Sequence, residues 1–167
     1  MIALELTDVK DFMNKLLRQE VFDHFLLQEA TITSAATYSI NGQITKGFYS
    51  EEELEELHLH GCRFLPYAML RGNCFDLIKG KKTPSAFRFV LLLSPSNMEK
   101  TIQSIDSTYK TTDVTGMYIN IKYQNQLLSL TTGIAYNTFS TDKTLENEWD
   151  KLVLRFLAQH AISYEEI

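Results

Sequence analysis

The sequence predicts an α+β protein built on antiparallel β-sheet, and two observations support that prediction. The first is an order of elements that occurs twice: residues 1–49 and 86–140 each begin with an apolar strand that leads into a helix, and strand-like stretches follow. The second is the short spacing of those later strands, because strands joined by tight turns pair antiparallel. We therefore expect two βαβββ-like halves, with a helical insert over 50–85 and a C-terminal helix over 142–160.

In the first half, the pattern predicts a strand over 2–6 and an amphipathic helix over 8–19. Residues 25–40 alternate and are rich in strand-forming side chains, so they predict one long strand or two. The dipeptide Asn41-Gly42 favours a type I′ hairpin turn, since both residues tolerate positive φ. Residues 43–49 are the expected return strand.

The insert begins with a capping signal. Ser50 and Glu53 can exchange hydrogen bonds across the first turn of a short helix over 51–58. Pro66 suits the start of a second helix, in which Cys74 belongs to an apolar stripe. Gly72-Asn73 is expected to interrupt that helix, because glycine costs about 1 kcal/mol relative to alanine there.

In the second half, the pattern predicts a strand over 87–93, a helix over 96–105 and a strand over 117–123. A turn at 124–126 and a return strand over 127–132 follow. Gly133 then allows a bend or bulge before a last strand over 134–139. The C-terminal helix is indicated by an apolar stripe that we interpret as core: Leu145, Trp149, Leu152, Val153, Phe156 and Leu157.

Composition limits the class of protein. The chain has 167 residues, of which 44% are hydrophobic and 22% charged, as in an ordinary globular domain, and we expect a single domain over 1–167. The net charge of -5 argues against a protein wrapped in nucleic acid over its whole surface. The start lacks the pattern of a secretory signal, and Val90–Leu93, the longest apolar run, is too short to cross a bilayer. We expect a cytoplasmic protein that makes no membrane contact and keeps Cys62 and Cys74 as thiols.

The element order given twice resembles the repeating half-domain of DNA sliding clamps, whose strands form outer sheets and whose helices line a ring around duplex DNA. The resemblance covers most of residues 1–49 and 86–140. Helices that face DNA need exposed Lys and Arg, and the helix over 96–105 offers only Lys100 against Glu99. Nucleic acid is therefore a weakly supported partner.

At closer range, two stretches are similar to an uncharacterised family of short bacterial proteins, described only as a domain of unknown function. They are Lys79-Gly80-Lys81-Lys82-Thr83-Pro84 before Phe87-Arg88-Phe89, and Asp142-Lys143-Thr144-Leu145-Glu146 before Trp149-Asp150. The similarity extends over the whole chain. It implies no activity, substrate or catalytic residue.

Two groups of residues are candidates for a site. Zinc-ligand types occur at His58, His60, Cys62 and Cys74, although no Cys-x-x-Cys accompanies them; the alternative is a surface histidine pair beside two packed thiols. Cys74 as a nucleophile would need a neighbouring histidine, and nothing in the sequence selects one.

The other group is basic: Lys79, Lys81, Lys82 and Arg88 predict a site for an anion or an acidic partner. The alternative is a solvated turn whose lysines keep a strand edge from pairing. A nucleotide P-loop is excluded, because its first glycine would have to stand where Phe75 does.

Two functions follow from these observations. The first is a non-catalytic binding or interaction module, with a protein partner or self-association and no cofactor. The second is a small enzyme, or a metal- or ligand-binding protein, that uses residues 58–82.

Overall fold

The computed structural model describes residues 1–167 and contains one seven-stranded sheet and five α-helices. The strands are β1 (Ala3–Leu6), β2 (Leu26–Thr33), β3 (Thr37–Asn41), β4 (Ala86–Leu92), β5 (Val114–Gln124), β6 (Leu127–Tyr136) and β7 (Tyr164–Glu166). The helices are α1 (Val9–Arg18), α2 (Glu51–Glu56), α3 (Tyr67–Ile78), α4 (Pro95–Gln103) and α5 (Thr144–Gln159), with a short 3-10 turn over Thr111–Asp113. The α+β class and the C-terminal helix are confirmed.

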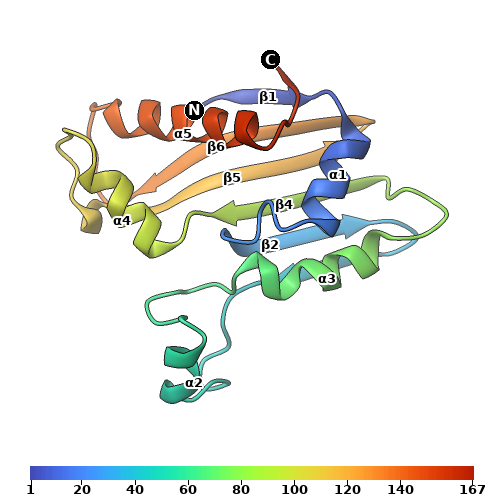
Figure 1. The fold of residues 1–167 in the computed structure, drawn as a ribbon, viewed down its shortest axis with the longest axis horizontal. Helices are drawn as coiled ribbons and strands as arrows, with labels where there is room; N and C mark the ends of the chain where they lie inside the picture. Colours follow the sequence, from blue (N-terminus) through green and yellow to red (C-terminus); the bar gives the residue numbers. More distant parts are fainter.

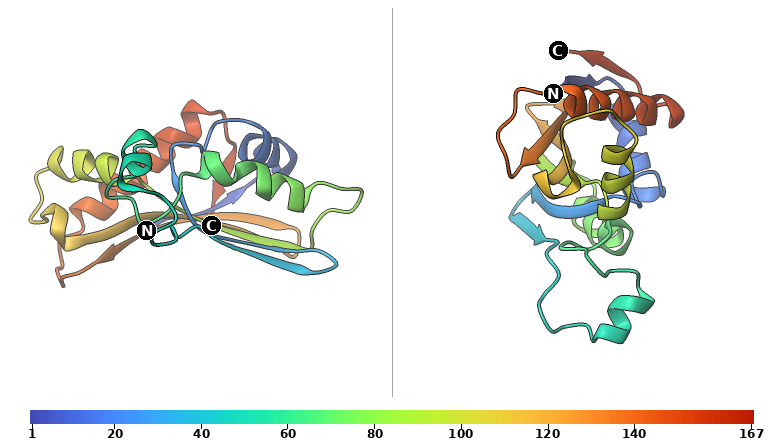
Figure 2. Two further views of the ribbon diagram at one scale, coloured as in Figure 1. Left: turned by 90° about the horizontal axis from the view of Figure 1, so that it is seen from below. Right: turned by 90° about the vertical axis from the view of Figure 1, so that its left-hand side faces the viewer.

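Every pair of neighbouring strands in the sheet is antiparallel, in the order β3-β2-β4-β5-β6-β1-β7. Helices α1, α3, α4 and α5 cover one face of this sheet, whereas α2 stands apart beyond its β3 side (Figures 1 and 2). None of the five helices has the combination of length and apolar composition that a membrane crossing requires. The four helices α1, α3, α4 and α5 therefore form a single layer on one of the sheet's two faces.

The core lies between the sheet and this helical layer. Side chains along a strand point alternately to its two faces, and in β4 Phe87, Phe89 and Leu91 belong to the main cluster of 28 buried residues. Arg88, between them, is exposed on the opposite face. That opposite face is not covered by any helix, which is the usual arrangement for an antiparallel sheet with one wet side.

The repeated order of elements does not extend to strand pairing. β1 and β2, which flank α1, are separated in the sheet by β4, β5 and β6. β4 and β5, which flank α4, are direct neighbours. Because neighbours alternate in direction, β1 and β2 run the same way and β4 and β5 run oppositely, so no rotation superposes the two segments. The expectation of two equivalent βαβββ halves is therefore corrected, and the clamp resemblance gains no support.

The hairpin expected at Asn41-Gly42 does not form. Residues 34–36 connect β2 to β3, and no return strand forms over 43–49, where Gln43 makes only an isolated bridge with Phe64. Gly42 is needed for a different reason: a Cβ there would lie 1.8 Å from the carbonyl oxygen of Leu27. The turn with two positive φ angles is instead at Asn125 and Gln126, with 53° and 63°, between β5 and β6.

Other local expectations have mixed outcomes. The capping box of Ser50 and Glu53 is present at the start of α2. α3 continues through Gly72 without interruption, and β6 passes through Gly133 to Tyr136 without a break. Tertiary packing outweighs the propensity cost at both glycines, because each lies in an element anchored to the core on either side. β7 was not expected, because three mostly exposed residues are too few to show the alternation of apolar and polar side chains that indicates a strand.

Gly42→Ala is expected to destabilise the protein by about 2–3 kcal/mol, because the added methyl group must displace the backbone at Leu27. Gly72→Ala is a matched control inside α3, where a Cβ would meet nothing within 4 Å. It should stabilise the protein by about 0.5–1 kcal/mol. Urea unfolding of the two variants measures both changes, and an unchanged stability for Gly42→Ala would contradict the close approach.

Candidate functional site

A groove lies between α1 and α3 on the helical side of the protein. It consists of two adjoining hollows of about 530 and 440 Å³ that share Lys10, Met13 and Leu17. The first hollow is lined by Asp8, Lys10, Asp11, Met13, Asn14, Leu17, Arg18 and Phe75. The second adds Val9 and the chain that leaves α3, with Ile78, Lys79, Gly80, Lys82, Thr83 and Pro84, and the sheet residues Phe87 and Tyr123. We call the two together the α1–α3 groove.

The two helices that form the walls are joined by a buried hydrogen bond. The hydroxyl group of Tyr67, at the start of α3, donates to the carbonyl oxygen of Leu16 in α1 at 2.9 Å. α1 ends at Arg18, so the Leu16 carbonyl is one of the last four that no amide of the same helix can satisfy. Desolvation raises the pKa of Tyr67 above its ordinary value, which keeps the hydroxyl protonated as a donor.

A second contact fixes the same end of the groove. Arg71 of α3 donates from Nε and Nη2 to the two carboxylate oxygens of Asp23, at 2.9 and 3.3 Å. This hydrogen bonding to Asp23 raises the pKa of Arg71, and both side chains are largely shielded from solvent. A bidentate pair restricts the angle as well as the distance between its partners. α3 therefore has a defined position relative to the turn that follows α1.

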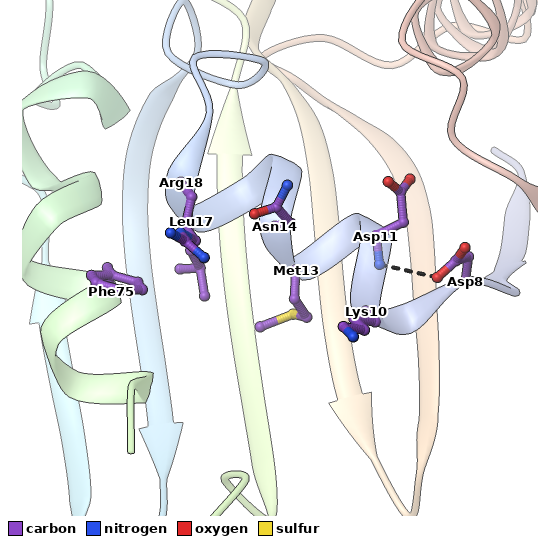
Figure 3. A pocket seen from close by; sticks show the side chains of 8 residues that line it. All are labelled: Asp8, Lys10, Asp11, Met13, Asn14, Leu17, Arg18 and Phe75. Carbon is purple, nitrogen blue, oxygen red and sulfur yellow. Dashed lines mark hydrogen bonds between the residues drawn. The ribbon is translucent and has the colours of Figure 1, made fainter. Parts of the chain in front are cut away.

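The floor of the groove is apolar. Phe75 reaches from α3 toward Leu17, and Met13 projects from the next turn of α1 (Figure 3). At the other end, Phe87 and Tyr123 stack with their rings 5.2 Å apart and 18° from parallel. Met13, Phe75 and Tyr123 are only half-buried, so part of this floor faces solvent.

The rim of the groove is mainly cationic. Lys79 is paired with Asp76 at 2.9 Å and lies over the ring of Phe75. Lys10, Arg18 and Lys82 form no ion pair. The lining contains four cationic side chains against two carboxylates, Asp8 and Asp11, and therefore carries a net positive charge in a chain whose total is -5. The two carboxylates have structural roles at the start of α1: Asp8 caps the helix and Asp11 pairs with Lys15.

The predicted anion-binding residues are only partly brought together. Lys79 and Lys82 line the groove, and the exposed Lys81 lies between them in sequence. Arg88 lies on the uncovered face of the sheet, where it pairs with Glu29 of β2 at 3.1 Å. Arg88 was grouped with the lysines because it is near them in the chain. Strand alternation places it on the other side of the sheet.

The zinc-ligand types are not gathered into a site. No group of three His, Cys, Asp or Glu side chains is placed to hold a metal ion. His58 and His60 are exposed, and Cys74 is fully buried in the core. Burial raises the pKa of Cys74 to about 12 and also raises the pKa of Cys62. A thiol in that environment is neither a good metal ligand nor a good nucleophile.

Several groove residues were missed as site candidates in the sequence. Met13 and Leu17 belong to the apolar positions that predict the helix over 8–19, and Phe75 was not assigned to the apolar stripe of the second helix. The available signal was the charge beside them, because Lys10 and Arg18 stand in the same predicted helix over 8–19. Only the approach of α3 shows that the stripe and the cations border one hollow.

Tyr67→Phe is expected to lower the free energy of unfolding by about 1–3 kcal/mol, since it leaves the Leu16 carbonyl buried without its donor. Denaturant unfolding measures the loss. Tyr38→Phe is a suitable control, because Tyr38 is 43% exposed in the edge strand β3. Equal stabilities for the two variants would contradict the capping role of Tyr67.

Cys74 is expected to resist alkylation by iodoacetamide in the native protein at pH 8. With a pKa of about 12, roughly one thiol in ten thousand is ionised at that pH, and the side chain is buried as well. Cys62 is half-buried and should react first. Mass spectrometry of peptides from native and urea-unfolded protein locates the modification, and rapid labelling of native Cys74 would restore the case for a reactive thiol.

Comparison with known proteins identifies a family but no activity. No curated protein and no solved structure matches the chain. The sequence pattern of one family matches residues 15–165, which includes α3 and the end of α1 but not the groove residues between Asp8 and Asn14. The chain therefore belongs to the family of unknown function DUF5721.

Proposed function

We propose that this chain is a non-catalytic binding module that holds an acidic, amphipathic helical segment of a protein in the α1–α3 groove. One observation carries the proposal: a half-exposed apolar floor is bordered by Lys10, Arg18 and Lys82, which have no partner within the chain. Apolar side chains of a ligand would cover the floor, and its carboxylates would meet the rim.

The extent of the groove along α1 supports a helix as the ligand. Its two hollows adjoin along α1, so Phe75 at one end and Tyr123 at the other can be contacted by one elongated ligand. A helix presents apolar side chains at every third or fourth position along one face, and recognition of such a face by an apolar groove is a common mode of peptide binding. Flanking glutamates would then lie within reach of the cations.

Nucleic acid fits this groove less well. Asp8 and Asp11 occupy one end of the lining and would repel a continuous phosphate backbone. The floor is formed by aliphatic and aromatic side chains that pack against apolar groups rather than hydrogen-bond to base edges. A ligand whose charges are grouped on its flanks avoids both difficulties.

The proposal places this binding in the cytoplasm. Cys62 and Cys74 are both free thiols, which is the usual state in a reducing compartment. The interaction does not depend on either thiol.

Binding is testable with a fluorescent designed peptide of about four helical turns, with leucine on one face and glutamate elsewhere. Fluorescence polarisation at low salt should show binding that weakens as salt increases, because exposed charges are screened. The double variant Lys10→Glu/Lys82→Glu is expected to weaken binding about three- to tenfold. Lys151→Glu, which changes an exposed lysine of α5 outside the groove, should have no effect.

A version of the peptide with lysine in place of every glutamate is the matched ligand control. It should bind the wild-type protein more weakly than the acidic peptide does, and the double variant should reverse that preference. Equal binding of both peptides, or an effect of Lys151→Glu as large as that of the double variant, would contradict the proposed site.

A further inference from the structure

The segment that carries α2 is an arm that stands away from the rest of the protein. We call residues 43–64 the α2 arm. Its two ends pair as a short ribbon, with a bridge between Gln43 and Phe64 and a hydrogen bond from the amide of Ile44 to the carbonyl of Arg63 at 3.0 Å. In Figure 1 the arm extends beyond the β3 side of the sheet, below α3. It is therefore a projection with a defined base and not an extension of the core.

The base of the arm is restrained by the close approach at Gly42. The Gly42 amide donates to the carbonyl of Gln28 at 2.9 Å, and its own carbonyl accepts from the amide of Leu65 at 2.9 Å. Because a Cβ at Gly42 would collide with the Leu27 carbonyl, the ribbon leaves the sheet in direct backbone contact with β2. Such a base resists bending of the arm toward other parts of the same chain.

The outer surface of the arm combines acidic and apolar side chains. α2 contains five glutamates in six residues and buries none of its side chains. Phe48 is 72% exposed and Leu57 is 43% exposed, on either side of this helix. With Lys46 and Arg63 as the only opposing charges, the arm carries a net charge of -3 out of the -5 of the whole chain. Large apolar side chains held in solvent beside a dense charge are typical of a contact surface.

These properties are complementary to those of the α1–α3 groove. The groove offers an apolar floor and a net positive rim, and the arm offers exposed apolar side chains and a net negative charge. The arm cannot reach the groove of its own chain, since α3 lies between α2 and α1 (Figure 1). A contact between the two surfaces therefore requires two molecules.

We propose that the α2 arm of a second copy of this chain occupies the α1–α3 groove, an inference that rests on the proposed function and identifies its ligand. Two copies related by a two-fold axis exchange arms reciprocally, so that both grooves are filled and the assembly closes as a dimer. A contact made by one six-residue helix would be too small to persist. Reciprocal exchange doubles the contact, because each copy contributes one arm and one groove.

The charges allow a test by reversal and mixing. The arm variant Glu55→Lys/Glu56→Lys leaves the capping box intact and places lysines at the end of α2, where they suit the helix dipole. The groove variant is Lys10→Glu/Lys82→Glu. Light scattering after gel filtration, at low salt and over a range of concentrations, should give about twice 19.2 kDa for the wild type. Each variant alone should associate at least about tenfold more weakly, since its arm and groove then carry like charge.

An equimolar mixture of the two variants is the decisive sample. The reversed arm of one meets the reversed groove of the other, and the unaltered arm meets the unaltered groove, so the mixture should recover association to within about threefold of the wild type. Lys151→Glu should behave as the wild type does. Circular dichroism of each variant verifies the fold, and Phe48→Ser, which keeps every charge, should weaken association through the apolar part of the arm alone.

The outcomes separate this inference from the proposed function. The exchange of arms is overturned if the wild-type chain stays monomeric. It is also overturned if the arm variant and the groove variant each associate as strongly as the wild type. If the designed acidic peptide still binds the groove in that case, the proposed function stands with another protein as the ligand. If neither the peptide nor a second copy binds, both are wrong.

Discussion

Tyr67 is the residue through which the helical layer, the sheet and the groove depend on one another. Its ring is fully buried and meets Phe89 of β4 edge-on, with centroids 6.2 Å apart and planes at 90°. Its hydroxyl group satisfies a carbonyl at the end of α1 that would otherwise be buried without a partner. One side chain therefore positions α3 against the sheet and α1 against α3, and the groove is the space left between the two helices.

The antiparallel sheet determines where such a groove can form. The main core of 28 buried residues lies on one face of the sheet, and the helices that pack on the sheet share that face. α1 connects β1 to β2 across three intervening strands and therefore crosses the layer obliquely, whereas α3 follows the β2 side. The two helices are joined where Tyr67 meets Leu16. Along the floor of the groove between them, Met13, Phe75 and Tyr123 are only half-buried and face solvent in part.

Negative and positive charge are concentrated on different parts of the protein. Most of the excess negative charge belongs to the α2 arm, which makes few contacts with the core, and the cations beside the groove have few acidic neighbours. Charges that are not paired within a folded chain influence which partners approach it and in what orientation. A net charge of -5 for the whole chain conceals this separation, which is why composition alone pointed only to local contacts.

Much of the fold could be predicted from the sequence because its elements carry their own local signals. The apolar stripe around Trp149 predicted α5, and the Ser50–Glu53 pair predicted the start of α2. An apolar run predicted β4, and alternation predicted β5. The hairpin turn predicted at Asn41-Gly42 was wrong, because glycine is required in two different situations. It allows a positive φ angle, and it allows another backbone segment to approach closely. Only the position of Leu27 distinguishes the two at Gly42. The candidate site could be predicted only in part, as Lys79 and Lys82 lie in the groove and Arg88 does not.

The sequence by itself determined the class of fold, most of the elements and the presence of a basic loop, because periodicity, capping and charge act over a few residues. The tertiary structure alone decided the strand order, the non-equivalence of the two segments and the groove. These depend on which elements meet across long separations in the chain, as Leu16 and Tyr67 do, and such meetings are set by the packing of all the elements together.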